Sequence, residues 1–526
     1  MLGHRSRFLT VVVAAALSLS AAAPAATATP DVPAAGQCAP DPAAPKQQLR
    51  AEWIASVANI DWPSQRGLTA DQQKAELVRW YDEAVAQGLN AVVVQIRPTA
   101  DAFWPSQYEP WSHWLTGTQG VDPGYDPLAF AVTEAHKRNL EFHGWFNPFR
   151  VSMTTDVNAL APTHPARVHP EWIVSYGGKL YYNPGIPEVR QHTIDAIMDA
   201  VRRYDLDAVH FDDYFYPYPV AGQTFDDAAT YAQYGGGLPL ADWRRQNIDA
   251  LISGISEEIR SAKPWVQFGV SPFAVWRNVA TDPTGSQTQA GVQTYDDLYA
   301  DTVKWVREEW IDYIVPQVYW NIGFTAADYA KLVPWWSAVV AGTDVNLYIG
   351  HANHKVANPA QPAAWQDPAE MSRQLTFNRD FPQVKGDIYF SAVQVRANRL
   401  SHMSIVKADH YQHPAIPPTS GRLVGRGPGL PAIVDATRTS SGVRLAWVSG
   451  AATSYAVYRL DGHRFLGRCD LADARYLMGT VRADRGPLQR FTDTTAVPGQ
   501  RYTYVVTALD RVNNESSPST PRFVRG

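Results

Sequence analysis

The chain has 526 residues, a formal net charge of −5 and 45% hydrophobic residues. This length exceeds one ordinary domain of about 150 residues, so two or three units are expected. The mild charge gives no indication of nucleic-acid binding or of attachment to an anionic membrane surface. Aromatic residues make up 12% of the chain, including 18 Trp, which indicates stacking surfaces, a large core, or both.

The N-terminal segment has the organisation of a secretory signal peptide. Arg5 and Arg7 precede an apolar run over 8–17, and small residues follow as far as Ala28. The run is too short for a membrane span, and no later stretch approaches the roughly 20 uninterrupted apolar residues that a span requires. We therefore expect a signal peptide over 1–28, a flexible leader over 29–49, and a secreted or cell-envelope location.

Metal and cofactor signatures are missing from the sequence. Cys38 and Cys469 are the only cysteines; in an oxidising compartment they either form a disulfide or stay free, and both options remain open. There is no Cys-x-x-Cys, no His-Glu-x-x-His and no Gly-x-Ser-x-Gly, so we expect neither a zinc site nor an esterase of the α/β-hydrolase type. A metal held by His143, His210 and Asp212 is the minor alternative.

From Ala51 to about His413, short apolar strands alternate with amphipathic helices. The expected strands cover 53–59, 91–97, 140–147, the beginning of 208–219, 266–271, 313–319, 345–350 and 387–391. The expected helices cover 70–87, 127–138, 187–204, 241–262, 295–308, 326–340 and 368–378. Eight such units predict the α/β class, as a closed (β/α)8 TIM barrel over 50–413. An open doubly wound sheet is less favoured, because no Gly-x-Gly-x-x-Gly turn follows an early strand.

A second, smaller unit follows the barrel. Residues 414–430 are rich in Pro and Gly, which predicts a linker. Beyond it, alternating segments such as 443–447, 455–460 and 502–509 indicate short strands without helices. We expect a small all-β sandwich over 431–526, and the stretch 498–516 resembles the last strands of a fibronectin type III domain. Such a domain says nothing about chemistry by itself.

The segment 208–219 carries two adjacent acids, Asp212 and Asp213, at the end of the fourth strand. If Val209 and Phe211 pack outward, alternation places His210, Asp212 and Tyr214 on the inner face. Caps and turns are the ordinary use of a lone Asp. However, a carboxylate at the C-terminal end of a barrel strand indicates catalysis, and here the other strand ends lack acids.

The other strand ends carry planar polar and aromatic side chains, which suit a polyhydroxylated ring-shaped ligand. The expected substrate-binding residues are Gln95, Arg97, His143, Asn147, His210, Tyr214, Gln317, Tyr319 and Trp320. The alternative for the two histidines is a satisfied place in the core.

Glycoside hydrolysis usually needs a second carboxylate, which here must come from a loop. The candidates are Asp101, Glu109 and Glu171. Glu109 is favoured because it stands among aromatic residues, and an apolar setting raises a carboxyl pKa as a general acid requires. A solvated loop position is the ordinary alternative for such a Glu.

Several long motifs in the predicted barrel support a family likeness. They cover 52–64, 95–98, 108–112, 144–150, 183–189 and 210–217. In these motifs, and over about residues 48–390, the chain resembles glycosyl-hydrolase-like family 10, the YngK-like group. The resemblance implies an exported (β/α)8 barrel acting on bacterial glycan, including peptidoglycan strands. It maps the family's Asp-Asp and Glu-Pro-Trp motifs onto Asp212, Asp213 and Glu109.

The resulting expectation is an exported glycoside hydrolase that cleaves a cell-wall glycan or an extracellular polysaccharide. Asp212 would stabilise or attack the oxocarbenium-like centre, Glu109 would act as general acid, and Asp213 would orient neighbours or replace either. The alternative from another class is a carbohydrate-binding barrel without catalysis, since the fifth to eighth strand ends offer no carboxylate. No cofactor, nucleic acid or membrane span is expected.

Overall fold

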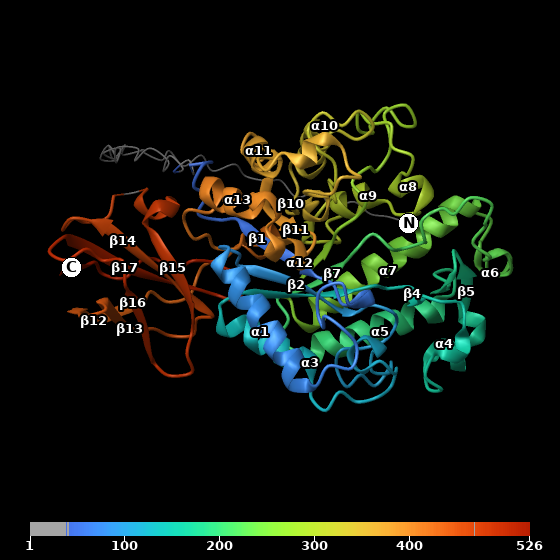
Figure 1. Ribbon diagram of the computed structural model, residues 1–526, viewed down its shortest axis with the longest axis horizontal. Coiled ribbons are helices and arrows are strands. Elements are labelled where there is room, and N and C mark those ends of the chain that lie inside the picture. The colour runs from blue at the N-terminus through green and yellow to red at the C-terminus, as the bar shows by residue number, and fades with distance from the viewer. Residues whose placement is uncertain (1–37, 39–40, 468) are drawn as a thin grey trace, which may run out of the picture. The chain divides into compact units, whose positions relative to one another are not determined.

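The computed structural model describes residue 38, residues 41–467 and residues 469–526 (Figure 1). The predicted signal peptide lies outside these residues, as do 29–37 and 39–40 of the predicted leader. The described end of the leader contacts the rest of the chain: the Gln48 amide donates to the Ile416 carbonyl at 3.0 Å, and the first strand begins at Leu49. Cys38 and Cys469 are each disulfide-bonded, which resolves the alternative that the sequence left open. None of the described helices is both long enough and apolar enough to cross a membrane.

Eight parallel strands close into a barrel, as predicted. In order around the barrel they are β1 (Leu49–Ile54), β2 (Ala91–Arg97), β3 (Glu141–Phe146), β7 (Ala208–Phe211), β8 (Gln267–Val270), β9 (Tyr313–Ile314), β10 (Asn346–His351) and β11 (Val384–Tyr389). The first strand begins and ends earlier than predicted. Ala58 and Asn59 have φ angles of 56° and 53°, and this left-handed backbone does not continue a strand.

Helices follow the strands around the outside of the barrel (Figure 1). The main ones are α1 (Ala70–Ala86), α3 (Pro127–Lys137), α5 (Pro187–Arg203), α7 (Leu240–Ala262), α10 (Tyr329–Val340), α11 (Glu370–Asn378) and α13 (His402–His410). The single helix predicted over 295–308 is instead two, α8 (Thr294–Asp297) and α9 (Thr302–Arg307). Tyr299 between them has a φ angle of 52°, and Asp301 caps α9 by accepting from the Lys304 amide.

Alternation along the strands separates the two faces of the barrel wall. Val209 and Phe211 belong to the large core beneath the helices, whereas Ala208 belongs to a smaller core inside the barrel. His210 therefore points inward, as the period of two predicts. Gly269 makes room in this interior, because an added Cβ would lie 2.0 Å from the Tyr313 ring.

The loop after β3 contains a three-stranded antiparallel sheet that was not predicted. Its strands are β4 (Arg150–Ser152), β5 (Ile173–Tyr176) and β6 (Lys179–Tyr182), in the order β4-β6-β5. Gly177 and Gly178 join β5 to β6 with φ angles of 58° and 75°. Two positive φ angles are typical of a tight hairpin turn, so the Gly-Gly pair was the available sequence signal.

The C-terminal part is all-β, as predicted, and forms two sheets (red in Figure 1). One contains β12 (Ala432–Thr439), β13 (Gly442–Val448) and β16 (Leu488–Asp493); the other contains β14 (Ser454–Asp461), β15 (Leu477–Arg482), β17 (Arg501–Leu509) and β18 (Arg522–Arg525). Trp447 from the first sheet and Tyr455 from the second share one core, with ring centroids 5.3 Å apart.

Polar contacts join this β-sandwich to the barrel. Arg511 donates to Asp205 at 2.8 Å, and Asn513 donates to Glu141 at 2.7 Å. The segment predicted as a linker also packs against the barrel, where Arg422 donates to Asp312 at 2.7 Å. The sandwich is therefore held against the barrel by direct hydrogen bonds as well as by the chain connection.

Candidate active site

Asp212 directly follows β7, at the C-terminal end of the barrel. Its Oδ2 accepts from Asn147 Nδ2 at 2.5 Å, and its Oδ1 accepts from the Tyr214 amide at 3.2 Å. Burial and the neighbouring charge of Asp213 raise the Asp212 pKa to about 7, despite opposing contributions from Arg150 and Asn147. A carboxyl group with this pKa can hold a proton near neutral pH and give it up in a reaction.

Asp213 lies in a different set of hydrogen bonds. The Tyr218 hydroxyl donates to its Oδ2. Burial raises the Asp213 pKa, while hydrogen bonds from Tyr218 and Gln317 partly stabilise its charged form. Two neighbouring buried carboxyl groups resist ionising together. The two carboxyl groups can therefore share one proton near neutral pH.

Glu109 is ionised and paired, contrary to the raised pKa that the sequence predicted. Arg97 donates to its two oxygens, from Nε at 2.7 Å and from Nη2 at 2.5 Å. His192 Nε2 lies 3.5 Å from Oε1. Burial alone would raise the Glu109 pKa, but the Arg97 charge and the hydrogen bonds from His192 and Arg97 outweigh it and lower the pKa to about 2. Glu109 is therefore not a proton donor near neutral pH.

Arg97 is fully buried and its donors are used inside the protein. Besides the two bonds to Glu109, its Nη1 donates to the carbonyl oxygens of Asn147 and Pro148. Arg97 was predicted to bind substrate, but this geometry gives it a different task. Through these hydrogen bonds Arg97 links the Glu109 carboxylate, in the loop after β2, to the backbone of Asn147.

Gln95 also supports Asn147 instead of facing a ligand. Gln95 Oε1 accepts from the amides of Ser56 and Val57, and its Nε2 donates to Asn147 Oδ1 at 2.6 Å. Arg150 Nη2 donates to the same oxygen at 3.0 Å. Two donors on Oδ1 fix the amide so that its NH2 group faces Asp212. Sequence reasoning missed Arg150 as a site residue, although it follows Asn147 by three positions.

The two predicted ligand-binding histidines lie in the barrel interior. The Trp53 indole donates to His210 Nε2 at 3.1 Å. Because an indole only donates, neutral His210 carries its proton on Nδ1. That N–H donates a hydrogen bond to Tyr313 Oη, 3.1 Å away. Tyr313 Oη lies 3.1 Å from His143 Nδ1. Burial and the charge of His143 lower the His210 pKa well below its usual value.

This chain of polar groups continues to Glu141, whose carboxylate lies 3.1 Å from His143 Nε2. The nitrogens of both histidines are thus occupied by protein partners. The contacts correspond to satisfied core histidines, the alternative weighed from the sequence, and they place neither residue to bind substrate directly.

Aromatic side chains form the wall beside the two acids. The ring centroids of Tyr214 and Tyr218 are 5.5 Å apart, those of Tyr218 and Phe273 are 6.2 Å apart, and those of Phe273 and Trp320 are 5.4 Å apart. Tyr319 is close enough for the Asp213 and Asp212 charges to add to the effect of burial in raising its pKa. Such rings offer flat apolar faces to the C–H surfaces of sugars.

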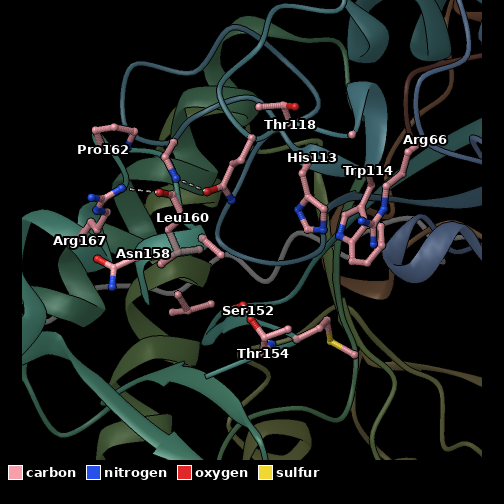
Figure 2. A pocket seen from close by; sticks show the side chains of 16 residues that line it. Arg66, His113, Trp114, Thr118, Ser152, Thr154, Asn158, Leu160, Pro162 and Arg167 are labelled. Carbon is pink, nitrogen blue, oxygen red and sulfur yellow. Dashed lines mark hydrogen bonds between the residues drawn. The ribbon is translucent and has the colours of Figure 1, made fainter. Parts of the chain in front are cut away.

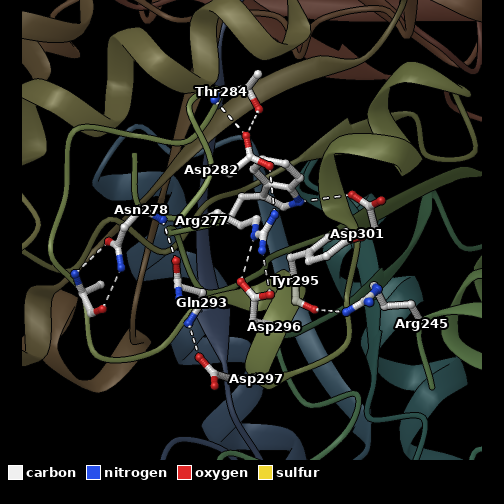
Figure 3. Close-up of polar contacts among 12 residues, drawn as sticks. Arg245, Arg277, Asn278, Asp282, Thr284, Gln293, Tyr295, Asp296, Asp297 and Asp301 are labelled. Carbon is white, nitrogen blue, oxygen red and sulfur yellow. Dashed lines mark hydrogen bonds and ion pairs between the residues drawn. The ribbon is translucent and has the colours of Figure 1, made fainter. Parts of the chain in front are cut away.

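Phe273 begins a long loop after β8 that is braced by ion pairs (Figure 3). Arg277 donates to Asp296 at 2.8 Å and to Asp282 at 2.8 Å. The Tyr295 ring lies 4.0 Å from the Arg245 guanidinium and 4.7 Å from that of Arg277. These contacts give the loop that carries Phe273 a fixed conformation, which the sequence alone did not indicate.

The remaining acids considered from the sequence serve other purposes. Asp101 is buried and accepts from Thr99 at 3.1 Å and from Gln119 at 3.1 Å. Glu171 is exposed and contacts His169 at 3.0 Å. Among the described residues, no group of three or more His, Cys, Asp and Glu side chains is arranged to hold a metal ion. The acids that the structure brings together at the barrel mouth are Asp212 and Asp213.

Comparison with known proteins gives consistent matches to glycoside hydrolases. The profile of the family described as Glycosyl hydrolase-like 10 matches residues 48–367. Glycosyl hydrolase YngK of Bacillus subtilis is 49% identical over 483 residues, covering 90% of this chain and 92% of the relative. Glycosyl hydrolase DigH of Escherichia coli is 41% identical over 365 residues, covering 65% and 83% respectively.

The glycoside hydrolase domain of PgaB (BpsB) from Bordetella bronchiseptica superposes with a TM-score of 0.44 and 14% identity, covering 69% of this chain and 99% of that one.

Proposed function

We propose, from the premise that this chain belongs to the glycosyl hydrolase-like 10 family and is a glycoside hydrolase, that its substrate is a bacterial cell-wall glycan. The strands of peptidoglycan are the first candidate and an extracellular polysaccharide is the second. The N-terminal segment, with Arg5 and Arg7 before an apolar run, supports an exported enzyme that meets such a glycan outside the cytoplasm.

The observation that carries the chemistry is the difference in environment between Asp212 and Asp213. Asp212, with a pKa of about 7, takes the role of general acid that the sequence predicted for Glu109. It donates a proton to the glycosidic oxygen as the bond to the leaving sugar breaks. Asp213, whose charge Tyr218 and Gln317 stabilise, faces the oxocarbenium-like centre. It either takes a proton from the water that attacks the anomeric carbon, or bonds to that carbon itself and is then displaced by water. Glycosidic cleavage uses one carboxyl group that donates a proton and a second one that is ionised, and a pair that shares one proton can supply both.

The other site residues prepare this pair. Asn147, fixed by Gln95 and Arg150, donates to Asp212 and orients it. Glu109 has a positioning role in this proposal, because its ion pair with Arg97 holds the backbone of Asn147 in place. Tyr319 and Trp320 stack on the sugar, and Gln317 bonds to its hydroxyl groups or to Asp213.

The substrate is tested with purified polymers. Wild type and Asp212→Asn are incubated with intact peptidoglycan, with glycan strands freed of stem peptides, and with neutral mannan and cellulose oligomers. New reducing ends and the masses of the products are measured. The proposal expects cleavage of one of the two cell-wall preparations by wild type and not by the variant. Cleavage confined to the neutral polymers would refute the assigned substrate.

Export is tested separately, by expressing the full chain and a chain lacking residues 1–28. The proposal expects the full chain in the medium or the cell envelope and the truncated chain in the cytoplasm. An identical distribution of the two chains would contradict it.

A further inference from the structure

A cavity of about 510 Å³ opens beside the barrel mouth, between the loop after β2 and the insertion that begins with β4 (Figure 2). Its volume falls within the range of about 300 to 1,000 Å³ that ligand pockets occupy. The insertion links it to the acids, because Arg150 bonds to Asn147 and the following residues, Val151 to Thr154, line the cavity. The proposed chemistry makes no use of this cavity.

The lining is rich in hydrogen-bond donors. None of the sixteen residues that line the cavity is Asp or Glu, and Arg66, His113 and Arg167 are among them. In the part of the chain that the structure describes, Arg66 has no hydrogen bond or ion pair, and its guanidinium rests on the Trp114 ring at 4.2 Å. Arg167 spends one donor on the Leu160 carbonyl at 2.9 Å. Most of the N–H groups of both arginines remain available to a ligand.

Two carboxylates that neighbour the lining residues are already engaged. Asp101 accepts from Gln119 at 3.1 Å and lies 3.5 Å from His113. Asp156 accepts from the Asn158 amide at 2.9 Å. Asp101 thereby holds two lining side chains in place, and Gln119 Oε1 accepts from the Ala161 amide at 2.9 Å, which ties the two walls together. The cavity is a braced structure with unused cationic groups on it.

Figure 2 shows Arg66 and Arg167 on opposite sides of the cavity. Two separated guanidinium groups with free donors match oxyanions that are spaced along a chain, since the planar guanidinium binds carboxylate and phosphate in bidentate fashion. Met153 supplies apolar surface for the part of the ligand between the charges, while the buried Trp114 ring supports Arg66 from below. A single small ion would fill only a small part of this volume.

We propose that the cavity lined by Arg66, Trp114 and Arg167 is an accessory subsite for a glycan that carries oxyanions. It holds the strand beside the barrel mouth while a neighbouring sugar occupies the Asp212–Asp213 site. The shared chemistry is a carboxylate on the sugar or a phosphodiester between units. This subsite extends the proposed function to a charged class of substrate, but its test does not depend on cleavage.

Binding is measured by calorimetry with four probes: oligogalacturonate, a glycerol-phosphate oligomer, a neutral cellulose oligomer and inorganic phosphate. The proteins are wild type, the double variant Arg66→Gln, Arg167→Gln, the double variant Arg66→Lys, Arg167→Lys, and Arg485→Gln as a control at an exposed position of the sandwich. Thermal unfolding checks that each variant is folded.

The proposal expects wild type and Arg485→Gln to bind at least one anionic oligomer, and the neutral oligomer far more weakly. Affinity falls about tenfold in the Gln double variant, partly recovers in the Lys double variant, and weakens at high salt. The oligomer that binds identifies the oxyanion. Equal binding by wild type and the Gln double variant, or binding of inorganic phosphate alone, would overturn the subsite.

The proposed cleavage and this subsite fail in different ways. If wild type cleaves none of the glycans but binds an anionic oligomer through the two arginines, the proposed function is refuted and the subsite is supported. Normal cleavage with no arginine-dependent binding would refute the subsite alone.

Discussion

Arg97 donates two hydrogen bonds to Glu109, from Nε at 2.7 Å and from Nη2 at 2.5 Å, and both side chains are fully buried. This ion pair gives the Glu-Pro-Trp motif a different electrostatic environment from that of the Asp-Asp motif. Glu109 stays charged because its pKa is held at about 2, whereas Asp212 has a pKa raised to about 7. We therefore propose that the acids after β7 transfer the proton and that the Glu109 loop supports them.

Glu109→Gln is expected to lower stability and activity together. The variant leaves the Arg97 charge buried without its partner, which costs about 3–5 kcal/mol of unfolding free energy. Since Glu109 is not the acid, the pH at which the residual activity declines on the alkaline side stays unchanged. A shift of that alkaline limb, with stability unaffected, would instead support Glu109 as the general acid.

Asp212→Asn is expected to stabilise the protein near neutral pH. The folded pKa of about 7 lies above the ordinary pKa of an Asp carboxyl group, 3.8. Folding therefore takes up a proton between these pH values, and the contribution of Asp212 to stability falls as pH rises through this range. Removing the group should raise the unfolding free energy at pH 7 by on the order of 2 kcal/mol. Near pH 4 this gain in unfolding free energy should vanish. Denaturant unfolding of wild type and variant at pH 7 and at pH 4 measures the gain at each pH. Equal effects at both would contradict the raised pKa.

Asn147→Ala should move the alkaline limb of the activity profile to higher pH. Asn147 donates to Asp212 at 2.5 Å and helps to lower its pKa. Without this hydrogen bond, Asp212 stays protonated to a higher pH. Gln95→Ala removes one of the two groups that donate to Asn147 Oδ1. It should shift the alkaline limb in the same direction but by less. Profiles that match wild type in both variants would refute the positioning role.

Trp320→Ala should raise KM by about tenfold while changing kcat much less, since the indole is proposed to stack on a bound sugar away from the bond that breaks. The matched control is Trp335→Ala, whose indole donates to Thr284 in the loop after β8 and stacks at 6.2 Å on Trp276. Steady-state kinetics on soluble glycan fragments measures both. An unchanged KM in Trp320→Ala would remove this residue from the binding wall.

Arg511→Met should destabilise the docked β-sandwich. Arg511 donates to Asp205 at 2.8 Å and lies 3.2 Å from Asp207, whose pKa it helps to lower. Loss of this partly buried partner should cost about 1 kcal/mol or more of unfolding free energy, while kcat at a permissive temperature stays as in wild type. Calorimetric unfolding tests this, with exposed Arg485→Met as the control. An unchanged melting profile would show that the contact contributes nothing.

The barrel and the inward direction of Asp212 were predictable because both follow from local periodicity. Alternation over Val209, His210 and Phe211 fixes which face each side chain takes, and the structure confirms it. The Gly177-Gly178 pair was a sequence signal for the hairpin, but its strands are short and lie within a long loop, so they were not predicted.

The environment of Glu109 was not predictable in the same way. Its sequence neighbours are aromatic and suggested a raised pKa. The pKa is instead governed by Arg97, twelve positions earlier at the end of β2, which the folded loop brings back onto the carboxylate. Likewise, the occupation of Gln95, His143 and His210 by protein partners depends on contacts between strands that are distant in sequence.

The most direct test of the account is the rate at which purified peptidoglycan glycan strands acquire new reducing ends, measured for wild type, Asp212→Asn, Asp213→Asn and Glu109→Gln. The account predicts that each Asp variant loses at least about 100-fold in kcat, while Glu109→Gln keeps the wild-type alkaline limb in whatever activity it retains. Undiminished cleavage by Asp212→Asn would contradict the central claim that Asp212 supplies the proton.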